Sequence, residues 1–172
     1  MDKHMAAPVT FRPYSFAERE TCLSLFDANC PEFFAPNERA DYSNFLDTTP
    51  SGYELCIAND QVAGAFGLIG TGTLRRSLNW IMLNPQFQGL GIGSAVMARV
   101  TALAIVAGLE TVDIAASHKS APFFAKFGAS TTGTIPDGWG PGMHRVDMSL
   151  SIQKPTNSFK PDPLRGSAQF RR

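Results

Sequence analysis

Residues 83–94 read LNPQFQGLGIGS, and this stretch decides how the rest of the chain is interpreted. Hydrophobic residues over 78–83 run into a proline, then into a turn with glycine at every second position, then into an apolar helix. Alternating glycines let the backbone approach a ligand closely and present its N–H groups to that ligand. The N-terminus of the following helix adds partial positive charge. The stretch therefore predicts a strand, a phosphate-binding turn and a helix.

Two common phosphate-binding motifs do not match this turn. A nucleotide P-loop needs Gly-Lys-Ser/Thr after the glycines, and none follows. A dinucleotide fingerprint needs Gly-x-Gly-x-x-Gly, whereas Gly89, Gly91 and Gly93 are evenly spaced. Asp113 lies at about the right distance downstream for a ribose-binding acid, but it falls inside a predicted strand. A simpler alternative stays open, in which the glycines form a tight turn that binds no ligand.

Composition indicates one globular domain. Hydrophobic residues make up 44% of the 172 residues, which is enough for an ample core. The formal net charge is zero, so no whole-protein field attracts nucleic acid or a membrane. The charge is uneven, because residues 151–172 carry a net +4 and residues 1–150 a net −4. A mildly acidic body suits a cationic amine substrate, although ordinary surface charge is the simpler explanation.

The cysteines and the chain ends indicate a cytoplasmic protein. Cys22 and Cys30 are expected on one helix, where eight residues separate them by about 12 Å, too far for a disulfide. Together with Cys56 they form no disulfide framework, and no metal site is predicted. We expect neither a secretory signal nor a membrane-spanning helix. Residues 1–7 are interpreted as a cloning remnant and residues 153–172 as a flexible C-terminal tail.

Hydrophobic periodicity and turn residues predict an order of strands and helices. Asn59-Asp60 is expected to form a hairpin turn, Asn37 and Ser120 to cap helices, and Gly108 to end one. Crossover handedness makes the strands before and after the long helix parallel. The expected strands cover 9–14, 53–58, 62–69, 78–83, 111–115, 130–135 and 144–152, the last two joined by a loop rich in Gly and Pro, and the expected helices cover 16–29, 38–46, 93–107 and 121–127.

The stretch over 83–94 resembles motif A of the GNAT superfamily, the acyl-CoA-dependent N-acyltransferases. That motif has a hydrophobic residue, x, Pro, two more residues, and then Gln/Arg-x-x-Gly-x-Gly/Ala. Its slots are filled in order by Leu83, Pro85, Gln88, Gly91 and Gly93. The resemblance implies an α/β fold with a mixed sheet splayed between its fourth and fifth strands, helices on both faces, and a single domain over 8–152.

A second segment supports the resemblance and also departs from it. The family pattern is Asn-x-x-Ala-x-x-Tyr-x-x-x-Gly-Phe, and residues 118–129 read HKSAPFFAKFGA. Ala121 and Gly128 match, but His118 takes the Asn slot and Ala129 replaces the aromatic residue. Phe124 stands where many relatives have a tyrosine proposed to protonate the leaving thiolate. Phe124 has no hydroxyl, so that role does not transfer to it.

The resemblance implies where acetyl-CoA binds. Pantetheine would lie in the wedge between the splayed strands and pair with the backbone near Leu83, while the diphosphate would rest on N–H groups of residues 88–94. We interpret Phe123 and Phe124 first as aromatic residues of the core and of the wall that contacts the cofactor. The residues implied to contact the cofactor are Met82, Leu83, Gln88, Gly89, Leu90, Gly91, Ile92, Gly93, Ser94, His118, Phe123 and Phe124.

Acetyl transfer to an amine needs a base more than it needs an acid. An alkylammonium with a pKa near 10 must lose a proton, whereas a thiolate with a pKa of about 8–9 leaves with little help. The fourth strand has no acid, although some relatives keep a Glu there. The candidate bases are Glu54, His118, Asp137 and His144, of which His118 has the best position and a suitable ordinary pKa. A backbone N–H at Leu83 would polarise the thioester carbonyl, and Ser120 is a hydroxyl available to the thiolate.

These residues predict an N-acetyltransferase that moves the acetyl group of acetyl-CoA to a primary amine of a small molecule, by direct attack in a ternary complex. Two alternatives stay open: a catalytically silent acyl-CoA-binding module, and a peptide or protein N-acetyltransferase, which would need an open groove. The acceptor site is expected between the first two helices, Phe33-Phe34 and residues 137–142. Monomer and homodimer are both open.

Overall fold

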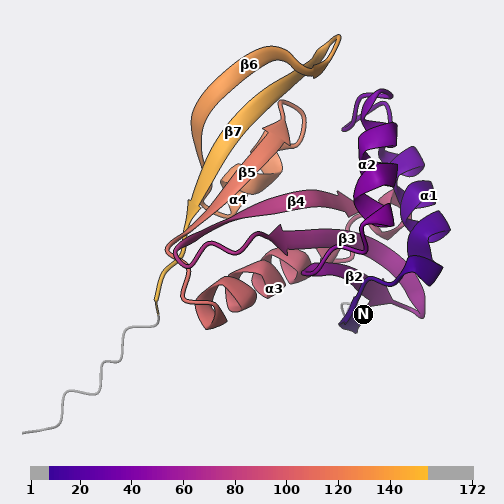
Figure 1. Cartoon of the computed structure of the whole chain (residues 1–172), viewed down its shortest axis with the longest axis horizontal. Helices are drawn as coiled ribbons and strands as arrows, with labels where there is room; N and C mark the ends of the chain where they lie inside the picture. The colour runs from indigo at the N-terminus through magenta and orange to yellow at the C-terminus, as the bar shows by residue number, and fades with distance from the viewer. Residues whose placement is uncertain (1–7, 155–172) are drawn as a thin grey trace, which may run out of the picture.

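The structure is a computed structural model that describes residues 8–154, and it is built on one mixed sheet (Figure 1). Its seven strands lie in the order β1-β2-β3-β4-β5-β7-β6. The elements are β1 (Val9–Pro13), η1 (Phe16–Glu18), α1 (Arg19–Asn29), α2 (Glu38–Asp47), β2 (Tyr53–Ala58), β3 (Gln61–Ile69), β4 (Arg75–Leu83), η2 (Pro85–Phe87), α3 (Ile92–Val106), β5 (Thr111–Ser117), α4 (Ala121–Lys126), β6 (Ser130–Gly140) and β7 (Met143–Ser151). The predicted order of strands and helices is confirmed.

The sheet is splayed between β4 and β5. These two strands run parallel and pair from Arg75 opposite Thr111 to Leu78 opposite Ile114, after which the pairing stops. Beyond that point β4 stays bonded to β3, and β5 stays bonded to β7. Figure 1 shows the two strands diverging toward their carboxyl ends, with the β6–β7 hairpin carried away from α1 and α2. The predicted splay is therefore confirmed, and it opens a wedge at the end of β4.

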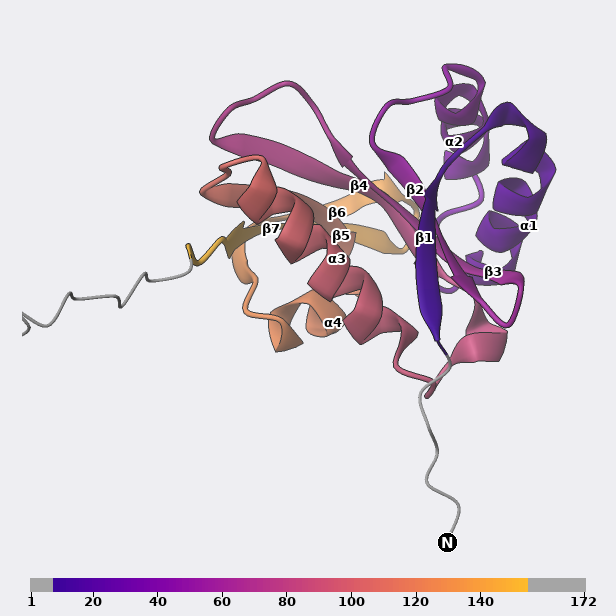
Figure 2. The same cartoon turned by 90° about the horizontal axis from the view of Figure 1, so that it is seen from below.

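Helices cover both faces of the sheet, as predicted. The helices α3 and α4 lie against one face (Figure 2), where Val96 and Val100 of α3 are fully buried in the larger of two core clusters. The helices α1 and α2 lie on the other face, over a second cluster that contains Phe26 and Tyr42. Only one face of α3 is buried, and the apolar residues Ile105 and Val106 near its end are exposed.

The local turn predictions hold. Asn59 and Asp60 both have positive φ, +50° and +59°, as a two-residue hairpin turn requires. Gly108 has φ +71° directly after α3, and the N–H of Leu109 donates to the carbonyl of Ala104 at 2.9 Å, which ends the helix.

The largest extensions beyond the predicted strands are those of β4 and β6. The strand β4 begins at Arg75 rather than at 78, because its first residues pair with β5 through backbone groups while their side chains are polar. The strand β6 continues to Gly140, so the predicted Gly- and Pro-rich loop over 136–142 was wrong for most of its length. Pro136 is tolerated because β6 is an edge strand of the sheet.

The two predicted helix caps are not made by side chains. Asn37 precedes α2 but has helical backbone angles, and its Nδ2 donates to the carbonyl of Trp139 at 2.9 Å. Ser120 precedes α4, but its Oγ accepts from the N–H of Ser117 at 3.0 Å and makes no bond into the helix. Both side chains are used for tertiary or loop contacts.

The chain ends and the cysteines complete the description. The predicted cloning remnant over 1–7 lies outside the described residues, as does the predicted tail after Lys154. Between residues 8 and 154, no helix is long and apolar enough to cross a membrane. The three cysteines are free thiols, in agreement with the sequence.

Candidate active site

A cleft of about 800 Å³ opens where β4 and β5 separate. It is lined by β4, the motif turn and α3, by β5 and α4, and by the segment between α1 and α2, so it connects the two faces of the sheet. Of the residues predicted to form the site, Leu90 and His118 do not line the cleft. Those that do are Met82, Leu83, Gln88, Gly89, Gly91, Ile92, Gly93, Ser94, Ser120, Phe123 and Phe124.

The glycine turn presents free amides to this cleft. Gly89 and Gly91 have φ +79° and +78°, and a Cβ at either position would meet nothing within 4 Å. Glycine is therefore required by the backbone angle and not by crowding. The first helical bond of α3 runs from the N–H of Ala95 to the carbonyl of Gly91 at 3.0 Å. The N–H groups of residues 92–94 precede that bond and have no helical partner, as at any helix N-terminus.

The α4 side of the cleft is positively charged. Lys119 and Lys126 line it, and the N-terminus of α3 adds its partial positive charge. The acidic residues that line the described cleft are Glu32, in the segment between α1 and α2, and Glu38, the first residue of α2, on the other face of the sheet. The cleft is thus polarised from a cationic end to an acidic end.

Aromatic rings and one buried carboxylate form the acidic end. Phe34 stacks on Trp80 with 6.1 Å between ring centroids, and Phe33 lines the same region. Glu38 is 6% exposed, and its Oε2 accepts from the N–H of Ala35 at 2.7 Å. Burial raises the pKa of Glu38 to about 7, against a lowering by that N–H bond. Sequence reasoning missed this residue, because nothing in the helical pattern marks a charged side chain that tertiary packing will bury.

The end of β4 is held in place from two sides. The N–H of Asn84 donates to the carbonyl of Ala63 at 2.8 Å, toward β3. Backbone groups alternate along a strand, so the N–H of Leu83 points to the other side, where β5 has separated. The carbonyl of Leu83 accepts from Nδ2 of Asn29 at 2.9 Å, and Asn29 also lines the cleft. Asn29 was not among the predicted site residues.

A bulge interrupts β4 just before this point. The register with β3 shifts between Ala65 opposite Met82 and Gly67 opposite Asn79. Trp80 lies within the shift and has φ +48°, which is unusual for a residue with a bulky side chain. Such bulges leave backbone groups outside the ladder and re-aim nearby side chains. Here the bulge directs β4 along the wall of the cleft.

The predicted base His118 lies beside β7. Its Nδ1 accepts from the N–H of His144 at 3.1 Å, and the two imidazole rings are 4.7 Å apart. The Nδ1 of His144 in turn accepts from the N–H of Asp137 at 3.0 Å. None of the three lines the cleft within the described residues. The catalytic role predicted for His118 stays a prediction.

Glu54, the last of the four candidate bases, is paired with an arginine outside the cleft. Its carboxylate accepts two bonds from the guanidinium of Arg99 on α3, at 2.9 and 3.2 Å, and it does not line the cleft. A carboxylate paired in this way holds β2 against α3. The Glu54–Arg99 pair therefore has a structural role.

Ser120 and Phe124 lie on the wall formed by the β5–α4 connection. The hydroxyl oxygens of Ser117 and Ser120 are 3.0 Å apart, and both residues line the cleft. Phe124 is 3% exposed, and its ring centroid lies 5.1 Å from that of Phe123. The wall therefore offers a pair of hydroxyls but no phenol.

The two sides of the cleft are joined at the acidic end. Asn37, before α2, donates to the carbonyl of Trp139 on β6, and the indole N–H of Trp139 donates to the carbonyl of Ala116 on β5, each at 2.9 Å. The approach is tight, since a Cβ on Gly140 would lie 2.4 Å from Oδ1 of Asn37. Trp139 itself lines the cleft. The link from α2 through β6 to β5 joins the two sides of the cleft at this end.

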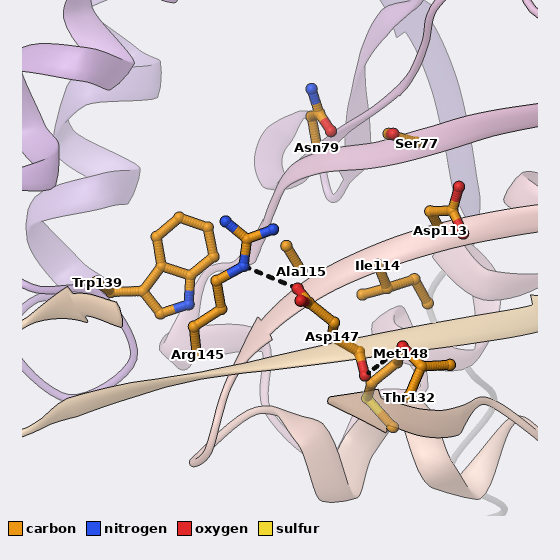
Figure 3. A pocket seen from close by; sticks show the side chains of 10 residues that line it. All are labelled: Ser77, Asn79, Asp113, Ile114, Ala115, Thr132, Trp139, Arg145, Asp147 and Met148. Atoms are coloured by element: carbon orange, nitrogen blue, oxygen red, sulfur yellow. Dashed lines mark hydrogen bonds and ion pairs between the residues drawn. The ribbon is translucent and has the colours of Figure 1, made fainter. Parts of the chain in front are cut away.

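A second hollow of about 420 Å³ lies on the polar face of β4, β5 and β7 (Figure 3). Nε of Arg145 donates to Asp147 at 2.7 Å, and the Arg145 guanidinium lies 5.1 Å from the centre of the Trp139 ring. Asp113 accepts from Nε of Arg75 at 2.6 Å. The charged groups in this hollow therefore neutralise one another, in contrast to the separated charges of the larger cleft.

Comparison with known proteins identifies the architecture. The model of the acetyltransferase (GNAT) family matches residues 22–129. Ard1 from Thermoplasma volcanium is similar in structure, with a TM-score of 0.72 and 15% identity over 85% of this chain and 99% of that one. No curated protein sequence matches the chain.

Two further solved structures have the same fold. The ribosomal-protein-S18-alanine N-acetyltransferase from Escherichia coli has a TM-score of 0.70 and 12% identity, over 88% of this chain and 98% of its own. An aminoglycoside 6'-N-acetyltransferase complexed with coenzyme A has a TM-score of 0.66 and 12% identity, over 84% and 97%. At these identities the likeness concerns the fold alone.

Proposed function

The chain belongs to the GNAT family of acetyltransferases, and from that premise we propose that it acetylates a primary amine of a small molecule with acetyl-CoA as donor. The observation that carries the proposal is the polarised cleft. Its cationic end suits the phosphates of acetyl-CoA, and its acidic, aromatic end suits an amine. The two ends meet at the termination of β4, where the acetyl group would be transferred.

The cofactor is proposed to bind along the motif turn and β4. Its diphosphate would accept hydrogen bonds from the amides of Gly89 and residues 91–94, with Lys119 and Lys126 adding charge. The N–H groups of Gln88 and Leu90 already donate to the carbonyls of Pro85 and Phe87. Pantetheine would run in the wedge past Met82 and Leu83, because β4 lacks a partner on that side. Phe123 and Phe124 supply the apolar wall.

Direct attack in a ternary complex is favoured by the absence of a thiol nucleophile. None of Cys22, Cys30 and Cys56 lines the cleft within the described residues, and burial raises the pKa of the Cys22 thiol to about 11. The amine nitrogen would attack the acetyl carbon while the Leu83 N–H polarises the carbonyl oxygen. The Ser117–Ser120 hydroxyl pair is available to the departing thiolate.

The link between the walls at the acidic end supports a small acceptor over a peptide. A peptide chain needs a groove that is open at both ends, whereas the bonds from Asn37 to Trp139 and from Trp139 to Ala116 join the walls here. A protein acceptor would have to insert a single side chain or its terminal residue beneath this link.

Thiol release from acetyl-CoA tests the proposal. The enzyme is assayed with a panel of small aliphatic and aromatic primary amines and, in parallel, with peptides that carry a free α-amine or a lysine. We expect saturable thiol release with small amines and acetylated product by mass spectrometry. Release with peptides alone would favour the protein N-acetyltransferase, and acetyl-CoA binding without release would favour the silent module.

A further inference from the structure

Glu38 is a buried carboxylate without a cationic partner. It is the first residue of α2 and is 6% exposed. One of its oxygens, Oε2, accepts from the N–H of Ala35 at 2.7 Å. Across residues 8–154 it forms no ion pair with Lys, Arg or His. Acids are rarely this buried unless they are paired with a cation. Glu38 has no such partner in the described chain, so a cationic ligand is expected to supply it.

The second oxygen of Glu38, Oε1, is not sealed inside the protein. Every fully buried side-chain nitrogen or oxygen in the described residues has a hydrogen-bond partner. No bond within the described chain is assigned to Oε1, so Oε1 is not sealed inside the protein. Glu38 lines the cleft, and the cleft is therefore where that oxygen is reached.

The surroundings of Glu38 suit an ammonium group attached to an apolar body. Phe34 and Trp80 are stacked on one another in the same part of the cleft, and aromatic faces attract cations. The other acidic residue that lines the cleft, Glu32, lies in the loop before α2. The Cys30 thiol is also nearby; burial, followed by the charges of Asp27 and Glu38, raises its pKa. These aromatic and acidic groups would not add to the binding affinity of a neutral or anionic acceptor.

On the proposed function, we infer that Glu38 binds the ammonium group of the acceptor and takes its proton. The acceptor class is then a primary amine that is cationic in solution and carries a flat apolar or aromatic group. Such a molecule places its charge against Glu38 and its body against Phe34 and Trp80.

The transfer balances in three steps. An N–H bond of the ammonium breaks with its electron pair left on nitrogen, and an O–H bond forms on the Glu38 carboxylate. The nitrogen lone pair then forms the N–C bond to the acetyl carbon, and the C–S bond breaks with its pair on sulfur. The second proton lost from nitrogen goes to the thiolate, and Glu38 returns its own proton to solvent.

Charge and burial make Glu38 suitable for this step. Burial, with a smaller push from Asp41, raises the pKa of Glu38 to about 7. A base works best when its pKa lies near the operating pH. Below that pKa the group is a neutral acid that cannot attract an ammonium, so acceptor kcat/KM should rise with pH through this value.

Glu38→Gln is the decisive variant, because an amide oxygen still accepts from Ala35 while the charge and the basic site are gone. Asp41→Asn is the matched control, since it removes a carboxylate from the same turn of α2 at an exposed position outside the cleft. Glu38→Asp keeps the charge and should restore part of the effect. All three should unfold within a few degrees of wild type.

Binding is measured without turnover, by calorimetry on enzyme saturated with coenzyme A. The probes are 2-phenylethylamine and its neutral analogue 2-phenylethanol. We expect wild type and Asp41→Asn to prefer the amine, and Glu38→Gln to bind it at least tenfold more weakly while binding the alcohol equally. No preference in wild type, or an unchanged preference in Glu38→Gln, overturns the inference.

Turnover separates this inference from the proposed function. With the best amine of the panel, Glu38→Gln should lose about 10²–10⁴-fold in kcat/KM and lose the limb of the pH profile near 7. A rate within threefold of wild type, with that limb intact, overturns the proton transfer. An amine preference that depends on Glu38 without any turnover would contradict the proposed acetylation and leave the cation site standing.

Discussion

A Cβ on Gly93 would lie 2.7 Å from the Cε2 ring carbon of Phe123, so the start of α3 and the start of α4 touch where only glycine fits. This contact joins the two sequence segments, 83–94 and 118–129, that carry the family resemblance. Its consequence is that the last glycine of the motif turn has a packing role. Gly91, by contrast, is required by its backbone angle.

Gly93→Ala should therefore destabilise the fold by overpacking, by about 1–3 kcal/mol. The added methyl must push the Phe123 ring aside, and that ring lines the cleft. Urea denaturation gives the stability and calorimetry the acetyl-CoA affinity, which should fall as well. If the variant were as stable as wild type, the ring would have to move freely, and the tight contact would be refuted.

Tyr53→Phe should impair catalysis more than cofactor binding. The Tyr53 hydroxyl donates to the carbonyl of Trp80 at 2.8 Å and lies 2.8 Å from the hydroxyl of Tyr42. Its removal leaves both groups buried without this partner, which should cost about 1–3 kcal/mol of stability. The bulge at Trp80 would also relax, so we expect kcat to fall at least fivefold while acetyl-CoA affinity changes little.

The control for that variant is Tyr14→Phe. The Tyr14 hydroxyl donates to the carbonyl of Leu46 at 3.2 Å, away from the bulge. The Tyr14→Phe variant should be less stable than wild type but keep the wild-type kcat. Equal kcat in the two variants would mean that the Tyr53 bond has no bearing on the reaction.

Phe124→Tyr should change kcat by less than about tenfold, because a thiolate with a pKa near 8–9 gains little from a stronger acid. The new phenol would enter a wall that already holds the Ser117 and Ser120 hydroxyls. Steady-state rates at saturating substrates measure the effect. An increase of a hundredfold would show that thiolate protonation limits the wild-type enzyme.

His118→Ala should leave kcat/KM within threefold of wild type and keep the same pH profile. The imidazole lies beside His144 and outside the cleft lining, so its loss removes one backbone hydrogen bond, worth about 1 kcal/mol of stability. The measurement is a pH–rate profile beside that of wild type. A loss of about 10²–10⁴-fold would instead identify His118 as the base.

The features that could be predicted from the sequence are those that depend on residues close together in the chain. The Asn59-Asp60 turn and the stop at Gly108 depend on backbone angles that few residues adopt, so composition alone marks them. The extension of β6 past Ile135 depends on the pairing of Gly140 with Met143 of β7 across a register shift, and the burial of Glu38 depends on how α2 docks near the cleft. Neither leaves a local pattern.

Asn37 is the clearest case of a local rule that loses to tertiary structure. Its type and position suit a helix cap, yet its side chain bonds to the carbonyl of Trp139, 102 residues further along. That one contact both removes the expected cap and joins the two sides of the cleft at its acidic end. The glycine turn at the cationic end was easier to predict, because the turn and the helix after it are contiguous in the chain.

The central claim is that acetyl-CoA binds on the motif turn, and calorimetric titration of Gly91→Asp tests it most directly. The control is Gly108→Asp, which places the same charge at a similar positive φ, +71° against +78°, at the opposite end of α3 and away from the cleft. We predict that Gly91→Asp weakens acetyl-CoA binding at least tenfold, about 1.4 kcal/mol, because a carboxylate would face the diphosphate. Gly108→Asp should bind like wild type. Unchanged affinity in a folded Gly91→Asp protein would contradict the claim.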